Sequence, residues 1–106
     1  MKPLHNPDVD ALFAAILSLD SPEECYAFFE DVCTVKEIQD IAHRLKAAGM
    51  LAAGANYAEI SRETGMSTAT ISRVSKCLEY GAGGYKLALE KNAKCKMQNA
   101  ESESEE

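Results

Sequence analysis

Helix-start signals recur along the chain at intervals that leave room only for short helices. Asn6 and Ser21 each precede a proline, so each offers an N-cap followed by proline at the first helical position. Capping boxes, in which a glutamate stands three positions after the cap residue, begin at Ser21, Thr34 and Asn56. No segment shows sustained alternation of apolar and polar residues, so no β-sheet is expected. The pattern predicts an all-α fold of about six helices with short connections.

Apolar residues at helical spacing follow each start and define one face of each helix. The stripes of the first two expected helices are Val9, Leu12, Phe13, Ile16 and Leu17, and Cys25, Phe28, Phe29 and Val32. In the third expected helix Ile38, Ile41, Leu45 and Ala48 are expected to point inward, with Leu51 near its end. Gly54 predicts the end of the third helix, because glycine readily adopts a left-handed conformation there. Asn56 starts a helix of about two turns. A fifth helix is expected from Ser67 to about Glu79, and a sixth over residues 85–93.

The stretch EISRETGMSTATISR, residues 59–73, places a single glycine between two short helical patterns. A helix-turn-helix motif joins two helices at roughly 90–120° through a turn of three to four residues. Gly65 suits the end of the first helix, since glycine accepts a positive φ. The apolar residues spaced to fill the corner between the helices are Ile60, Ile71 and Val74. The sequence therefore predicts a helix-turn-helix at about residues 57–79.

Small polar side chains crowd the start of the second helix of this motif. Such side chains reach base edges or thymine methyl groups in a major groove while the backbone stays close. Free N–H groups at a helix N-terminus also favour a phosphate, and basic side chains on both flanks can neutralise others. The expected DNA contacts are Arg62, Ser67, Thr68, Ala69, Thr70, Ser72, Arg73 and Lys76. An ordinary helical hairpin with a polar surface is the alternative interpretation of these residues.

The net charge of −6 is distributed unevenly along the chain. Residues 1–43 carry two Lys and nine acids, whereas residues 44–96 carry nine Lys or Arg and four acids. Local charge decides which surface attracts nucleic acid, so a basic surface is expected around the helix-turn-helix. Residues 1–95 are expected to form one helical DNA-binding and dimerisation domain. Residues 96–106, which end in ESESEE, are expected to be an acidic, disordered tail.

Two stretches resemble the Trp repressor family: TVKEIQDIAHRLKAAGML at residues 34–51 and NYAEISRETGMSTATISRVSKCL at residues 56–78. The resemblance extends over about residues 7–91 and is greatest to a branch of Trp-repressor-related proteins from Gram-positive bacteria. It implies an all-helical homodimer in which the N-terminal helices of two chains are intertwined. It also implies a transcriptional regulator that binds a two-fold symmetric operator in double-stranded DNA, with half-sites about one helical turn apart.

The resemblance further implies a place for a small-molecule effector. In the tryptophan repressor two arginines hold the indole of the corepressor, and a threonine and a serine meet its polar end. The matching residues here are Arg44, Arg73, Thr34 and Cys77, the last in place of the serine. Val74 replaces a glycine that gives the ligand room, and overpacking typically costs about 1–3 kcal/mol, so tryptophan is not the expected effector. The alternatives are a smaller anionic effector, a pocket filled by Val74, or arginines that hold no ligand.

Other classes of function find less support in the residues. The four cysteines, Cys25, Cys33, Cys77 and Cys95, include no C-x-x-C pair, so neither a metal site nor a disulfide framework is expected. No catalytic constellation or cofactor motif is present, so an enzyme is not expected. The N-terminus carries acids where a signal peptide has its apolar core, and no apolar run approaches the roughly 18–20 residues of a membrane span; a cytoplasmic protein is expected. The competing hypothesis is a helical protein-interaction module, without specific DNA binding, that docks through its acidic first half.

Overall fold

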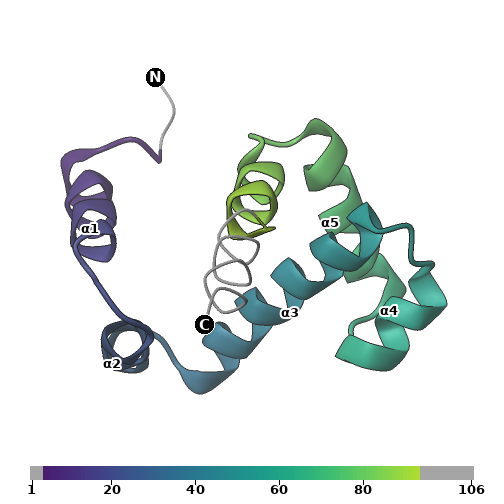
Figure 1. Cartoon of the computed structure of the whole chain (residues 1–106), viewed down its shortest axis with the longest axis horizontal. Helices are drawn as coiled ribbons and strands as arrows, with labels where there is room; N and C mark the ends of the chain where they lie inside the picture. Colours follow the sequence, from purple (N-terminus) through teal and green to yellow (C-terminus); the bar gives the residue numbers. More distant parts are fainter. Residues whose placement is uncertain (1–3, 94–106) are drawn as a thin grey trace, which may run out of the picture. The chain divides into compact units, whose positions relative to one another are not determined.

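Five helices follow one another between Pro7 and Tyr80 in the computed structural model, which describes residues 4–93 (Figure 1). They are α1 (Pro7–Leu17), α2 (Pro22–Val32), α3 (Val35–Ala52), α4 (Tyr57–Thr64) and α5 (Thr68–Tyr80). Residues 84–93 are also helical and form a sixth helix, called here the last helix. No residue from 4 to 93 belongs to a β-strand, which confirms the all-α prediction. The acidic tail predicted at residues 96–106 lies outside the described residues.

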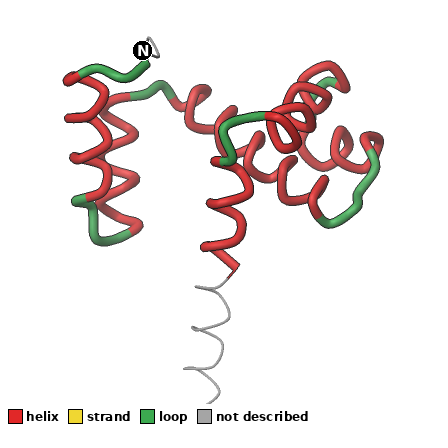
Figure 2. Tube along the Cα trace, turned by 90° about the horizontal axis from the view of Figure 1, so that it is seen from above, coloured by secondary structure: helices red, strands yellow, loops and turns green. Residues whose placement is uncertain are grey.

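Side-chain caps hold the starts of the helices where the sequence predicts them. Asn6 and Ser21 each accept a hydrogen bond from the backbone N–H three residues further along, at 2.9 and 3.2 Å. At α3 the capping is reciprocal: the N–H of Glu37 donates to Thr34 Oγ1 at 3.1 Å, and the N–H of Thr34 donates to the Glu37 carboxylate at 2.8 Å. A cap of this kind contributes about 1 kcal/mol. The loops between the helices of the described chain are short, as the sequence predicts (Figure 2).

The chain divides between Gln39 and Asp40 into two compact units. The N-terminal unit contains α1, α2 and the first turn of α3, and none of its described residues is buried. Phe28 and Phe29 are half-buried and meet edge to face, with ring centroids 5.3 Å apart. Phe13 is 50% exposed and Leu17 84% exposed. The apolar stripes predicted for α1 and α2 are thus present, but within one chain they enclose no core.

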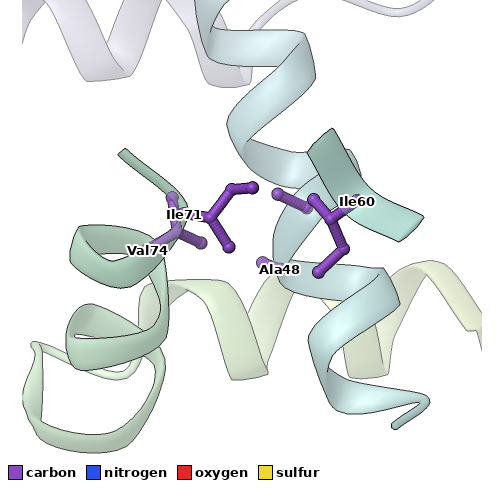
Figure 3. Packing of buried hydrophobic residues seen from close by; sticks show 5 residues of the cluster. Ala48, Ile60, Ile71 and Val74 are labelled. Atoms are coloured by element: carbon purple, nitrogen blue, oxygen red, sulfur yellow. The ribbon is translucent and has the colours of Figure 1, made fainter. Parts of the chain in front are cut away.

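The C-terminal unit contains the hydrophobic core of the described chain. Ala47 and Ala48 of α3, Ile60 of α4, and Ile71 and Val74 of α5 are each at most 3% exposed, and they converge where the three helices meet (Figure 3). Ala47 and Ala48 contribute small side chains to this cluster, and the branched side chains of Ile60, Ile71 and Val74 fill the rest of it. Three of these five residues, Ile60, Ile71 and Val74, are the ones predicted to fill the corner of the helix-turn-helix.

The last helix turns back onto this core. Tyr85 and Leu89 are partly buried and pack against the buried cluster. The connection is tight because α5 ends at Tyr80 and Gly81 caps it, with the Gly81 N–H donating to the Cys77 carbonyl oxygen at 2.9 Å. A Cβ atom at Gly81 would collide with that oxygen. Only glycine therefore fits this turn without a shift of the backbone.

The middle of α3 departs from the prediction. Ile41 and Leu45 were expected to point inward, yet they are 52% and 41% exposed. Within the C-terminal unit, burial on α3 begins only at Ala47, where Ile60, Ile71 and Val74 pack. The prediction is wrong for a single chain, because helical periodicity identifies an apolar face without identifying what covers it. Within residues 4–93 no helix is both long enough and apolar enough to cross a membrane.

Candidate nucleic-acid interface and adjoining cleft

The turn between α4 and α5 is held by hydrogen bonds from both sides. Gly65 is left-handed, with φ 73° and ψ 5°, and its N–H donates to the Ser61 carbonyl. The Ser61 hydroxyl donates to the carbonyl of Met66 at 2.8 Å. Thr64 is buried; its hydroxyl donates to the Ile60 carbonyl at 2.7 Å and accepts from the Met66 N–H at 3.2 Å. Because every one of these groups is satisfied inside the turn, the direction of α5 relative to α4 is fixed by both hydrogen bonds and packing.

The start of α5 is fixed by Ser67. Its hydroxyl accepts from the Thr70 N–H at 3.2 Å and lies 3.0 Å from the Thr70 hydroxyl. Thr68 and Ala69, which follow the cap directly, are exposed. The first turn of α5 thus presents small exposed side chains, and the Ser67 cap fixes its backbone.

Helical periodicity divides α5 into three faces. Ile71 and Val74 form the buried face. A second face, called here the reading face, carries the residues Thr68, Ala69, Ser72 and Lys76, of which only Ser72 is half-buried rather than exposed. The third face, with Thr70, Arg73 and Cys77, lines a cleft. Arg73 lies at the border of the reading face and the cleft, because it follows Ala69 by four positions and Thr70 by three.

Both helices of the motif carry exposed basic residues. Arg62 of α4, Lys76 and Arg73 are all exposed. Lys46 of α3 forms a 3.7 Å ion pair with Glu63, but both side chains are about half exposed, and such surface pairs contribute at most about 1 kcal/mol. The cations predicted to meet phosphates are therefore accessible to DNA.

The cleft lies in the C-terminal unit and has a volume of about 320 Å³. It is lined by Arg44, Thr70, Arg73, Val74, Cys77 and Tyr85. Val74 is 3% exposed and belongs to the core beside the cleft, so its side chain forms part of the wall without closing the space. Arg44 and Arg73 are exposed, and neither forms an ion pair or hydrogen bond with any residue from 4 to 93. The cleft thus combines two unpaired guanidinium groups with an apolar wall and three polar side chains.

Four of the five residues predicted for an effector pocket line this cleft. Thr34, the fifth, caps α3 through Glu37 and is not among the lining residues. Thr70 and Tyr85 complete the lining, although the sequence placed Thr70 among the DNA contacts and gave Tyr85 no role. Tyr85 reaches the cleft because the last helix folds back onto α5. An aromatic residue directly after a glycine-rich break was the only sequence signal for it, and that signal is weak.

Comparison with known proteins gives consistent results. The chain matches the Trp repressor protein family over residues 7–93. It is 53% identical over 88 residues to YerC, an uncharacterised protein of Bacillus subtilis, covering 83% of this chain and 85% of that protein. Among solved structures it resembles a candidate Trp repressor from Staphylococcus aureus, with a TM-score of 0.81 and 48% identity over 85% of this chain and 90% of that one.

A second solved structure, a TrpR-like protein from Eubacterium eligens, gives a TM-score of 0.83 and 47% identity. The alignment covers 85% of this chain and 93% of that one. The resemblance noted in the sequence is therefore confirmed over the helix-turn-helix and the helices that precede it. The family match extends over residues 7–93, and a relative is 53% identical to this chain. This chain therefore belongs to the Trp repressor family.

Proposed function

We propose that this chain is a sequence-specific, DNA-binding transcriptional regulator that acts as a homodimer on a two-fold symmetric operator. Its family consists of regulators and not of enzymes. The observation that carries the proposal is the reading face of α5. Thr68, Ala69 and Ser72 project from a helix whose start, turn and back are all fixed by contacts within the C-terminal unit.

The small side chains of the reading face suit direct contact with bases, because they let the helix come close to them. Small hydroxyl and methyl groups let the α5 backbone approach the floor of a major groove, where hydroxyls meet base edges and methyl groups meet thymine methyls. Arg62 of α4 and Lys76 of the reading face are exposed and can bind phosphates. Phosphate contacts position the helix without specifying sequence. Binding of this kind depends strongly on salt, because each neutralised phosphate releases counterions.

Dimerisation is supported by the apolar surface that one chain leaves uncovered. On α1 and α3 the exposed apolar residues include Phe13, Leu17, Ile41 and Leu45. The N-terminal unit also has an apolar groove of about 300 Å³, lined by Pro22, Cys25, Tyr26, Phe29 and Ile38. Uncovered patches of this kind mark interaction surfaces. A second copy of the chain, with α1 and α2 intertwined across the interface, would cover them and set two recognition helices for adjacent half-sites.

An effector in the cleft is a further part of the proposal. The volume of about 320 Å³ is at the lower end of the range for ligand pockets, and two guanidinium groups favour an anion. Val74 takes up space in the cleft that a glycine would leave open, which favours a ligand smaller than tryptophan. Since Thr70 and Arg73 belong to α5, a ligand that binds them can alter the position of the recognition helix. The proposed place of action is the cytoplasm, where a bacterial regulator meets chromosomal DNA.

Selection from random duplexes tests the DNA-binding function directly. The full-length protein at moderate salt should enrich a sequence with approximate two-fold symmetry. Its affinity should fall linearly on logarithmic axes as salt rises, with a slope set by the number of phosphates contacted. Recovery of no common sequence would count against the proposal and would favour a protein-interaction module.

A pair of matched variants tests whether the cations of α4 and α5 contact DNA or whether any exposed cation contributes equally. Arg62→Ala/Lys76→Ala removes two exposed cations of the helix-turn-helix and should flatten the salt dependence of DNA binding while the dimer persists. Lys86→Ala/Lys91→Ala removes two exposed cations from the last helix and should change affinity by less than about twofold. Equal losses in both variants would mean that DNA contacts are not centred on α4 and α5.

A further inference from the structure

Four of the six residues from 101 to 106, beyond the described part of the chain, are glutamates: Glu101, Glu103, Glu105 and Glu106. We propose that this acidic segment, residues 101–106, binds in cis at the cleft between Arg44 and Arg73 and so competes with DNA for the edge of α5. The segment would act as an internal substitute for phosphate that lowers DNA affinity. The competition rests on the proposed DNA-binding function; the binding of the segment at the cleft does not.

The cleft has cations without partners, which is the first requirement. Lys46 is paired with Glu63, at 3.7 Å. Arg44 and Arg73, in contrast, have neither an ion pair nor a hydrogen bond with the residues from 4 to 93, although both line the same cleft. Guanidinium groups bind carboxylates and phosphates through the same paired N–H donors. A carboxylate from elsewhere in the chain is therefore a chemically suitable occupant.

The acidic segment can reach the cleft from where the described chain ends. Tyr85 lines the cleft, and Ala93 lies eight residues further along the same helix, a rise of about 12 Å. Glu101 follows Ala93 by eight residues, which can span at most about 28 Å. The permitted span is more than twice the distance to be covered. Because the tether is so short, the local concentration of the segment at the cleft is in the millimolar range.

Arg73 links the two binding events. It lines the cleft and also lies at the border of the reading face, beside Lys76 on the neighbouring turn of α5. A guanidinium group that holds a glutamate cannot at the same time hold a phosphate with the same donors. Occupancy by the acidic segment would therefore remove one phosphate contact and place several negative charges near DNA. Both effects weaken with salt, since exposed charges are screened within about 8–10 Å near physiological ionic strength.

The test compares two full-length variants that remove the same number of negative charges. The first replaces the four glutamates of the acidic segment by glutamine. The second neutralises four exposed acids of α1 and α2, namely Asp10, Glu23, Glu30 and Asp31, with the matching amides. At low salt the first variant should bind the selected operator at least about fivefold more tightly than the wild type, and the second should differ by less than about twofold. Equal gains in both variants, or no gain in the first, would overturn the proposal.

A second measurement needs no DNA and remains informative if the protein binds none. A fluorescent peptide with the sequence of residues 99–106 is titrated into the full-length variant whose own acidic segment is neutralised. Binding should be saturable. It should be lost in an added Arg44→Gln/Arg73→Gln change and kept in an added Lys86→Gln/Lys91→Gln change, which removes two charges outside the cleft. If the peptide binds both of these proteins equally, the cleft is not its site and the proposal fails, whatever the outcome for DNA.

Discussion

Arg44 of α3 and Arg73 of α5 line the same cleft, although 29 positions separate them in the sequence, and neither is paired with another residue from 4 to 93. Two like charges facing one space repel each other and remain available to an anion. Because Arg73 also borders the reading face, the cleft and the candidate DNA interface share a residue. Any anion held by these arginines can therefore influence how α5 meets DNA.

Small oxyanions should stabilise the protein through this cleft. Sulfate, used as the probe, should raise the midpoint of thermal unfolding more than chloride does at equal ionic strength. At ten times its dissociation constant a ligand adds about 1.4 kcal/mol. Differential scanning fluorimetry measures the shift. The Arg44→Ala/Arg73→Ala variant should respond to the two salts alike; a persistent sulfate effect there would place the anion elsewhere.

Shortening Val74 should cost stability as a core residue does. Val74→Ala should lower the free energy of unfolding by about 2 kcal/mol, because a cavity remains beside Ile60 and Ile71. Val74→Gly should lower it by about 3 kcal/mol, since glycine adds a helix penalty of about 1 kcal/mol. Urea unfolding at fixed protein concentration gives both values, with Glu79→Ala as the exposed control. A loss below 1 kcal/mol for both would mean that Val74 only occupies ligand space.

Two glycines near the start of the last helix should respond in opposite ways to alanine. Gly81→Ala should destabilise the protein, because the new Cβ meets the carbonyl oxygen of Cys77. At Gly84 no atom lies within 4 Å of an added Cβ, and the residue is already helical, so Gly84→Ala should stabilise by about 0.4–1 kcal/mol. Circular dichroism during thermal unfolding compares the two; similar effects would contradict the tight turn at Gly81.

A charge on the apolar stripe of α1 should prevent dimerisation. Phe13→Glu places a carboxylate where a second chain is proposed to pack, and burying an unpaired charge is costly. Sedimentation velocity should then show a lighter species than the wild type. The control, Ala11→Glu, adds the same charge on the opposite side of α1, where the residue is also exposed. Dimerisation that withstands the Phe13 change would remove α1 from the interface.

The methyl group of Ala69 should contact a thymine methyl group in the operator. Where the selected half-site presents a thymine to it, replacing that base by deoxyuridine removes one methyl group, worth about 0.8 kcal/mol or about fourfold in affinity. Fluorescence anisotropy with the two duplexes measures the ratio. The Ala69→Gly variant should bind both duplexes equally, and a ratio that is unchanged in this variant would show that another residue meets the thymine.

The local chemistry of the sequence determined the helices and the turn. Caps such as Asn6, Thr34 and Ser67 act within three residues, and the left-handed glycine at position 65 ends α4 where it was expected. The corner residues Ile60 and Ile71 were identifiable because helical periodicity and the position of the glycine together place them on facing sides. These features were predictable because each depends on contacts between near neighbours.

Only the tertiary structure decided which side chains come together from positions far apart in the sequence. Periodicity pointed Ile41 and Leu45 inward, but in a single chain they lie exposed, since an apolar stripe does not specify what covers it. Tyr85 joined the cleft because the last helix folds back after Gly81, and the face of α5 that carries Thr70 lines the same cleft. Such contacts depend on the directions of whole helices, which are set by packing between residues far apart in sequence. The sequence by itself thus determined α5 and its reading face. The tertiary structure decided that the neighbouring face of α5 lines a cleft with two unpaired arginines.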